Sequence, residues 1–356
     1  MTEFNISAII VVLFLAGMLI SPGKQNDKRA MSVCYVIGAL LILSAAFRSS
    51  LVGADTPDFI DDYRAVRSMT LPNVIDYYSN SMFFFGLSWV FSKMGFSIYW
   101  WFGFIEFIYI FSVLYFIKKF CDDKLFAFFC FFTIGLFFPS YNILKQIVSL
   151  SFALLSFCSF IDKKKTLAIA LFICGFFAHQ SILVFALVYL LYIIRMKQKL
   201  VVASVIAILL VSLISGSIWA NVISGYGNEH YMMYMDSDND YSSVALYYLI
   251  LLLAIALITR GYQHRDKHEL VFLVGMSALA CIMQSFASTF SIAHRLAYFF
   301  MPFMLILITN SVSSIKGSDI KLFYKMLFIV IMSFFCIYTQ RNIPYIIDPK
   351  IVSFIF

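Results

Sequence analysis

The sequence predicts an all-α, multi-pass membrane protein with about 12 transmembrane helices. Of its 356 residues, 62% are hydrophobic and 13% charged, whereas charged residues make up about a quarter of an ordinary soluble protein. The mean hydropathy is +0.90. Apolar stretches long enough to cross a bilayer recur along the chain, and the short polar segments between them hold most of the Lys and Arg.

The basic residues predict which side of the membrane each loop occupies. Six short segments each carry three Lys or Arg and together hold 18 of the 26 in the chain. Cytoplasmic loops retain Lys and Arg, so we assign these segments to the inside. The net charge of +7 is then a topology signal, and nucleic acid is not an expected partner. The triplets are Lys24, Lys28, Arg29; Lys118, Lys119, Lys124; Lys163, Lys164, Lys165; Arg195, Lys197, Lys199; Arg260, Arg265, Lys267; and Lys316, Lys321, Lys325.

The spans are placed on the basis that a transmembrane helix needs about 20 residues. The first is expected to be retained rather than cleaved, because it follows Glu3 instead of a basic segment and lacks a small-residue cleavage site. Both termini are expected outside. The expected spans lie near residues 4–20, 31–47, 97–117, 125–139, 142–160, 166–179, 180–194, 200–217, 242–259, 269–287, 294–311 and 322–339.

Two placements depend on charge. Residues 81–94 are apolar enough to cross, but a crossing there would move Lys118, Lys119 and Lys124 to the outside, so we expect an outer amphipathic or re-entrant helix. Residues 166–194 have a basic triplet at both ends and must cross an even number of times. We therefore expect a hairpin of two short helices with His179 near its outer tip.

The chain is expected to form a single transmembrane domain, residues 1–356, with two sizeable outer loops. These loops, residues 48–96 and 218–241, are acidic and contain several Tyr. The seven Cys fall in expected spans or, for Cys121, in an inner loop, so no disulfide framework is expected. No CxxC pair or other ligand pattern indicates a metal site.

Several polar residues are expected at the outer ends of the spans. A cation within a mostly apolar helix end usually faces a cavity and has a partner. The outer position that they share favours a functional site over independent roles. These residues are Arg48 and Asp55 after the second span, Lys145 and Gln146 at the start of the fifth, His179 and Ser181 at the hairpin tip, and His294, Arg295 and Tyr298 at the start of the eleventh.

Three outward cations suit an anionic ligand reached from the outer leaflet, such as a lipid-linked diphosphate. Asp55 and His179 are candidate bases for a hydroxyl nucleophile. This combination indicates glycosyl transfer from a lipid diphosphate. The leaving group is already a stabilised anion, so no metal or other cofactor is required.

Each residue also has a purely structural interpretation. Arg and Lys near helix ends often extend to lipid head groups. His179 can satisfy backbone groups at its turn, and Asp55 can cap the backbone amides of a helix. Glu106 lies in the middle of the third span, where it is protonated, hydrogen-bonded to a neighbouring helix or part of a relay, with a structural role favoured.

Several strings resemble the EpsG and Wzy type of bacterial polysaccharide polymerase. They are FRSSLVGADTPDFIDDYR, FSKMGFS, NILKQIVSLSFALLSF, FFAHQSILVF and HRLAYFFMPFMLIL, in this order. The family pattern commonly has Arg where this chain has Lys145, which keeps the charge but not bidentate phosphate recognition.

The resemblance implies a GT-C-like bundle in the bacterial inner membrane that works on undecaprenyl diphosphate-linked oligosaccharides at the periplasmic face. It would transfer the growing glycan to the non-reducing end of an incoming lipid-linked repeat unit. Arg48, Lys145 and Arg295 would bind the diphosphate, and Asp55 and His179 would act as base or sugar-orienting groups. Further partners would be membrane lipids, a chain-length regulator and the flippase of the pathway, and the possible accessory residues are Gln146, Tyr298, Arg64 and His294.

Three other activities remain open. A flippase or exporter of the same lipid-linked sugar would place charged groups along a central path, whereas only Glu106 is expected at mid-depth. An O-antigen ligase shares the chemistry and the side of the membrane. A membrane-bound O-acyltransferase would need its histidine to meet an acyl donor, usually from the cytoplasmic side.

Overall fold

The computed structural model describes residues 6–20, 27–194, 240–259, 267–287, 293–340 and 345–348. Within these ranges the secondary structure is helical, with one isolated β-bridge between Arg48 and Ile347. The expected eighth span, residues 200–217, and most of the outer loop 218–241 lie outside the described residues. The chain divides into two compact units: unit 1 comprises residues 1–183 and 330–356, and unit 2 comprises residues 184–329.

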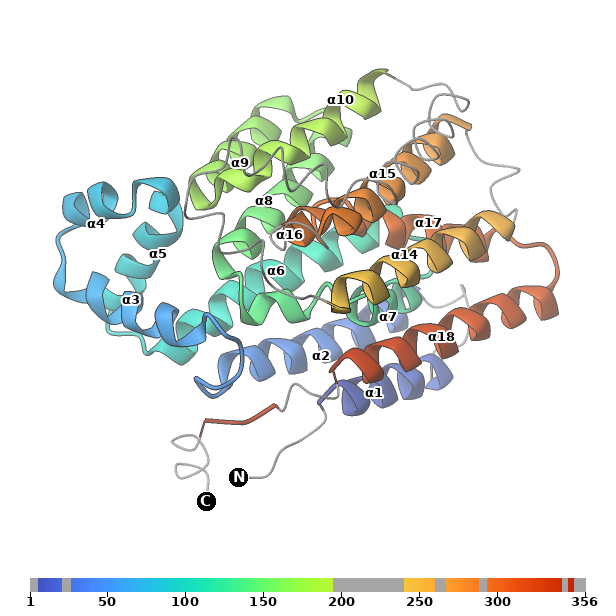
Figure 1. Ribbon diagram of the computed structural model, residues 1–356, viewed down its shortest axis with the longest axis horizontal. Helices are drawn as coiled ribbons and strands as arrows, with labels where there is room; N and C mark the ends of the chain where they lie inside the picture. The colour runs from blue at the N-terminus through green and yellow to red at the C-terminus, as the bar shows by residue number, and fades with distance from the viewer. Residues whose placement is uncertain are drawn as a thin grey trace. The chain divides into compact units, whose positions relative to one another are not determined.

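Unit 1 contains the N-terminal half of the chain and the end of the last helix (Figure 1). Its helix α8 packs against α6 and α9, and α2 packs against α6, α7 and α1. The elements are α1 (Ile6–Ile20), α2 (Asp27–Ala46), α3 (Thr56–Ser68), α4 (Leu71–Tyr77), η2 (Ser79–Ser81), α5 (Met82–Lys93), α6 (Ile98–Phe120), α7 (Lys124–Thr133), η3 (Phe138–Tyr141), α8 (Leu144–Ile161) and α9 (Lys165–Ala178), followed by η4 (Gln180–Phe185) across the boundary between the units.

Unit 2 contains helices of the C-terminal half. Its helix α15 packs against α10, α14, α16 and α17, and α14 also packs against α17. The elements are α10 (Ala186–Ile194), α14 (Asp240–Ile258), α15 (Lys267–Phe286), α16 (Ala293–Ala297) and α17 (Met301–Ser313), and α18 (Ser318–Gln340) begins here and ends in unit 1.

Local sequence explains where several helices begin and end. The Asp123 carboxylate accepts a hydrogen bond from the Phe126 amide at 3.1 Å and caps α7. This helix ends earlier than the expected span 125–139, because Gly135 adopts a positive φ of 91° and η3 follows. Helix α9 ends at Ala178, where His179 is extended.

The described helices occupy the positions of every expected span except the eighth. Those that are long and apolar enough to cross a membrane are Asp27–Ala46, Ile98–Phe120, Leu144–Ile161, His268–Phe286 and Ser318–Gln340. Shorter apolar helices are Ser7–Ile20, Lys124–Thr133, Lys165–Ala178, Gln180–Ile194, Val244–Ile258 and Met301–Ser313.

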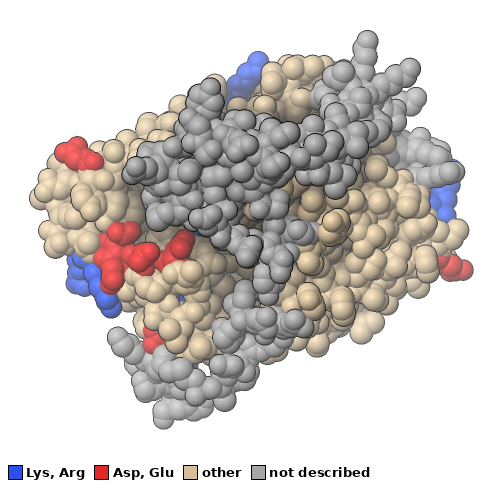
Figure 2. Space-filling view, in the orientation of Figure 1, with Lys and Arg blue, Asp and Glu red and all other residues tan. Residues whose placement is uncertain are grey.

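Helices α3, α4 and α5 form a separate group within unit 1 (Figure 1). The 12-residue α5 covers about 18 Å, less than the roughly 30 Å of a bilayer core, and it packs against α3, α4 and α9. An aromatic core that includes Phe84, Phe85, Trp101 and Phe102 joins this group to α6, α8 and α9. Figure 2 shows several Asp and Glu, with some Lys or Arg, on the part of unit 1 where Figure 1 draws α3 and α4.

Candidate functional site

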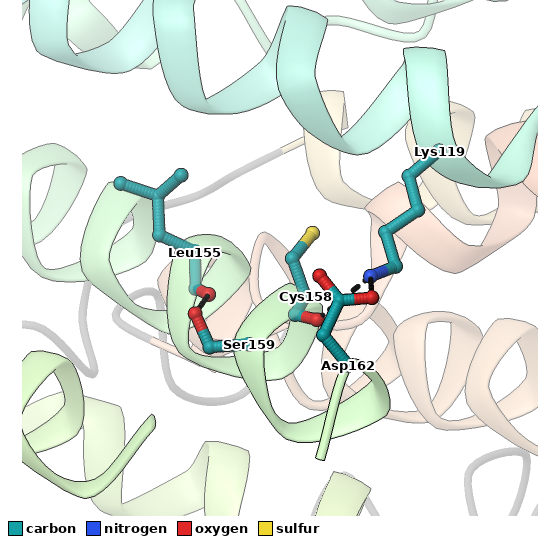
Figure 3. A network of polar contacts seen from close by, with 5 residues as sticks. All are labelled: Lys119, Leu155, Cys158, Ser159 and Asp162. Atoms are coloured by element: carbon teal, nitrogen blue, oxygen red, sulfur yellow. Dashed lines mark hydrogen bonds and ion pairs between the residues drawn. The ribbon is translucent and has the colours of Figure 1, made fainter. Parts of the chain in front are cut away.

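Two ion pairs define one end of unit 1. Lys119, at the end of α6, pairs with Asp162 just after α8, and its Nζ also donates to the Cys158 carbonyl at 2.9 Å (Figure 3). Lys124 Nζ lies 3.4 Å from Asp27 Oδ2 and joins the first residues of α7 and α2. Three of the predicted inner segments therefore meet at what we call the basic end of unit 1. The hydrogen bond from Lys119 holds the pKa of the Asp162 carboxyl below its usual range.

Arg48 lies at the opposite end of α2, about 30 Å from Asp27 for a helix of 20 residues. Its side chain is 2% exposed. Nη1 donates to the Ala45 carbonyl at 2.6 Å, and Cζ lies 4.0 Å from the Phe102 ring centroid and 5.4 Å from that of Tyr141. Burial lowers the pKa of Arg48 to about 10, so the guanidinium is still a cation at neutral pH.

The loop after Arg48 is fastened to η3 by Thr56 and Gly53. The buried Thr56 Oγ1 accepts a hydrogen bond from Arg48 Nε at 3.4 Å. Its O–H has two carbonyl acceptors within reach, that of Val52 at 2.7 Å and that of Tyr141 at 3.1 Å. Gly53 has a φ of +91°, and a Cβ there would lie 2.3 Å from the Tyr141 carbonyl oxygen. Only glycine fits this approach without strain.

Asp55 precedes the first turn of α3 and is half-buried. Its backbone carbonyl accepts a hydrogen bond from the Phe59 amide, but its carboxylate makes no capping bond to the helix. The Asp55 side chain therefore does not cap α3, contrary to its purely structural interpretation.

Lys145 lies in the first turn of α8, at the end remote from Asp162. It is half-buried, and its Nζ lies 5.5 Å from the Phe85 ring centroid of α5. Gln146 is buried beside it. Because Tyr141 contacts both Arg48 and Thr56 and lies a few residues before Lys145, the start of α8 is held close to the loop that carries Arg48 and Asp55.

His179 follows the last residue of α9 and contacts α8 through its backbone. The His179 carbonyl accepts a hydrogen bond from Ser149 Oγ at 3.1 Å, and Ser149 is one turn beyond Lys145 on the same side of α8. The ring Nδ1 accepts the Ser181 amide at 3.2 Å and lies 2.7 Å from Ser181 Oγ. With Nδ1 accepting, the neutral ring carries its proton on Nε2.

The remaining predicted residues lie elsewhere. Arg64, on α3, is exposed and pairs with Asp61 at 3.0 Å. Arg295 and His294 belong to α16 of unit 2, where the His294 ring packs edge-on against Tyr298 at 5.9 Å. Unit 1 thus brings together Arg48, Asp55, Lys145 and His179, and Arg295 belongs to the other unit.

Sequence patterns did not indicate the groups that surround Arg48. The C-terminal segment 345–348 pairs with residues 47–49 through Ser49 N to Ile346 O (2.8 Å) and Asp348 N to Phe47 O (3.0 Å). The Tyr345 hydroxyl donates to the Ser44 carbonyl at 2.6 Å, and burial raises its pKa to about 12. Thr56 lies within the ADTP string and Tyr141 directly precedes NILK, but neither residue type indicates a contact with Arg48.

The sequence was also compared with known proteins. It matches the EpsG family over residues 31–347. The chain belongs to the EpsG family. EpsG is a family of Wzy-type polymerases, and this EpsG member is a multi-pass membrane protein. No curated protein and no solved structure matches it.

Within the described part of this EpsG chain no group of three or more His, Cys, Asp and Glu is placed to hold a metal ion. The matched range contains every candidate residue from Arg48 to Arg295 and extends to Ile347 of the segment that covers Arg48. The candidate site therefore lies within the range that matches the family.

Proposed function

We propose that the protein is a polysaccharide polymerase that transfers a growing glycan from undecaprenyl diphosphate to the non-reducing end of an incoming lipid-linked repeat unit. The reaction takes place at the periplasmic face of the bacterial inner membrane, on a GT-C-like bundle of about 12 transmembrane helices. The lipid-linked oligosaccharide is the substrate, and a chain-length regulator and a flippase of the same pathway are the expected partners.

One observation carries this proposal: Arg48, Asp55, Lys145 and His179 are gathered at the end of unit 1 remote from the basic end. Two cations, a carboxylate and an imidazole at the side opposite the inner triplets suit an anionic lipid head group and a sugar hydroxyl. The family membership supports the same class of reaction.

The two cations of unit 1 and Arg295 bind the diphosphate. An Arg guanidinium offers parallel N–H groups to phosphate oxygens, and Lys145 offers a point charge. As the bond from the anomeric carbon to the diphosphate oxygen breaks, negative charge grows on that oxygen, and cations placed beside it lower the barrier. The leaving group is undecaprenyl diphosphate, and the lengthened glycan stays attached to the lipid carrier of the incoming repeat unit.

Asp55 and His179 act on the incoming sugar. Its hydroxyl oxygen attacks the anomeric carbon and loses its proton to the Asp55 carboxylate, which makes no capping bond to α3. In His179 the Nδ1 lone pair is engaged by Ser181, so the Nε2 proton orients a sugar oxygen as a donor. Arg64, Gln146, His294 and Tyr298 are accessory contacts to the glycan or lipid.

The test is complementation of a bacterial strain that lacks its own polymerase. We expect Arg48→Ala to abolish the long-chain glycan ladder. The core oligosaccharide of the lipopolysaccharide would then carry a single repeat unit. Arg67→Ala, an exposed residue at the end of α3 with no assigned role, should leave the ladder unchanged. An Arg48→Ala protein that is present in the membrane and makes a normal ladder would refute the proposal.

The same strain separates the rival activities. Loss of a flippase or a ligase leaves no repeat unit on the core, and loss of an acyltransferase leaves the polymer length unchanged. A single capped unit is the outcome that belongs to a polymerase.

A further inference from the structure

Two charged side chains are buried in the described part of the chain, Arg48 and Glu106. Arg48 is 2% exposed and Glu106 is 0% exposed. An Arg keeps its proton in proteins, and a buried cation is costly without a compensating negative charge. The two groups are close enough to interact electrostatically.

Two of the three guanidinium nitrogens of Arg48 donate hydrogen bonds to protein acceptors. Nη1 donates to Ala45, Nε to Thr56, and one face lies on the Phe102 ring. Nη2 has no hydrogen-bond partner among the described residues, and no carboxylate there forms an ion pair with Arg48.

The register of α6 places Glu106 on the side of the helix that faces Arg48, because the Phe102 ring contacts Arg48. Glu106 is four residues after Phe102, so both side chains project from the same side of the helix. Both Glu106 oxygens lack a hydrogen-bond partner in the described structure. Ser140 is close to the carboxylate, but its Oγ is unpaired as well.

Asn142, near the loop after Arg48, also has a buried side-chain atom without a hydrogen-bond partner in the described structure. Asn142 Oδ1 lies 3.0 Å from the Cβ position of Gly53, whose loop carries Thr56. Buried polar atoms without protein partners are usually joined by ordered water. The unpaired atoms near Arg48 include the donor Nη2, a carboxylate, a hydroxyl and an amide oxygen, which water molecules can link.

We propose that Glu106 is a positioning residue for Arg48: through bridging water it engages one N–H of Nη2 and aims the other at the diphosphate of the lipid carrier. The inference rests on the proposed function and deepens it, because it explains how a buried guanidinium is oriented toward its ligand. Glu106 does not touch the substrate.

The test measures binding of undecaprenyl diphosphate to the purified full-length protein in detergent. We expect Glu106→Gln to weaken binding roughly tenfold, a typical coupling between groups in one network, and Glu106→Asp to restore part of it. In the Arg48→Gln background, Glu106→Gln should change the affinity less than about twofold, because the guanidinium through which it acts is gone.

Thermal stability separates positioning from folding. Arg48→Gln alone strands a buried carboxylate and should lower the melting temperature, and the added Glu106→Gln should recover it without recovering binding. A purely structural Glu106 predicts instead that Glu106→Gln lowers the affinity by the same factor whether or not Arg48 is present. Ser112→Ala is the matched control on α6, where it removes a buried hydroxyl that bonds to the Tyr109 carbonyl, and it should bind normally.

The outcomes distinguish this inference from the proposed function. Wild-type binding by Arg48→Gln would refute the role of Arg48 in the proposed function. Weak binding by Arg48→Gln together with wild-type binding by Glu106→Gln, or an equal effect of Glu106→Gln in both backgrounds, would refute the inference alone.

Discussion

At the residue scale, the Asp55 carboxylate lies at the start of α3 and accepts no capping hydrogen bond from it. If the Asp55 carboxylate takes the proton of the acceptor sugar's hydroxyl, replacing it should remove this function without destabilising α3. We predict that Asp55→Asn lowers the polymerisation rate about a hundredfold or more and leaves lipid diphosphate binding and the melting temperature unchanged.

The matched control for Asp55 is Asp58→Asn, an exposed carboxylate in the first turn of the same helix. It should polymerise at the normal rate in the purified system. Equal rates for Asp55→Asn and Asp58→Asn would exclude Asp55 as the base and leave the acceptor proton to another group.

A second prediction at the residue scale concerns Lys145. Its ammonium lies over the Phe85 ring, a position in which a planar guanidinium also stacks well. We predict that Lys145→Arg retains activity, whereas Lys145→Ala costs about 2 kcal/mol of binding to undecaprenyl diphosphate, the value of a charged hydrogen bond.

Lys93→Ala is the comparison for Lys145, because Lys93 Nζ also lies over an aromatic ring, 5.9 Å from the Trp89 centroid, but at the end of α5. Lys93→Ala should bind undecaprenyl diphosphate with the affinity of the wild type. If both Ala variants lose the same affinity, the effect is one of general surface charge and the assigned role of Lys145 is wrong.

At the scale of elements, the loop between α2 and α3 is held by its close approach to η3. Gly53 and Gly95 both have positive φ, +91° and +84°, but only Gly53 has atoms within 4 Å of its Cβ position. Gly95→Ala should cost about 1 kcal/mol of folding free energy, and Gly53→Ala more than about 2 kcal/mol, because the added methyl meets the Tyr141 carbonyl.

Thermal or denaturant unfolding in detergent measures this difference directly. Equal destabilisation by the two substitutions would mean that the loop is not seated on η3. The position of Arg48 would then have to be explained by its own contacts alone.

The segment 345–348 is the second element that matters, because it covers Arg48 by pairing with residues 47–49. Since Arg48 is 2% exposed, the proposed diphosphate contact requires its surroundings to open, and we predict that this segment is the part that moves. Residues 49 and 346 lie opposite each other, and a backbone hydrogen bond of 2.8 Å joins them. Cysteines at such a cross-strand pair are close enough for a disulfide.

We predict that the Ser49→Cys, Ile346→Cys double variant is inactive when oxidised and active after reduction, as measured by glycan synthesis with the purified protein. The Ser49→Cys single variant controls for the substitution and should be insensitive to oxidant. An oxidised, cross-linked double variant that polymerises at the reduced rate would show that the segment need not open.

At the scale of the whole molecule, the sequence predicted the membrane class and the positions of most helices. Long apolar stretches that cross lipid satisfy their backbone hydrogen bonds as helices. That residues 81–94, which form the short α5, do not cross stays a prediction from the basic triplets. The same charge pattern predicted that Arg48, Asp55, Lys145 and His179 lie at one end, where unit 1 has them. Their action as one site stays a prediction.

The surroundings of Arg48 were not predictable in this way. Tyr345 contacts Ser44 across a separation of 301 residues, and hydropathy and charge carry no signal for such a contact. Glu106 was recognised as unusual, but its relation to Arg48 depends on which face of α6 meets α2. Packing, rather than residue pattern, decides that face.

The central claim is that Arg48, Lys145 and Arg295 act on one lipid diphosphate. An electron cryomicroscopy structure of the full chain with undecaprenyl diphosphate bound tests it most directly. We predict one diphosphate within hydrogen-bonding distance of Arg48 Nη2, Lys145 Nζ and the Arg295 guanidinium, on the side opposite Lys119 and Asp162. Three cations that contact separate lipids, or a diphosphate bound at the basic end, would contradict the account.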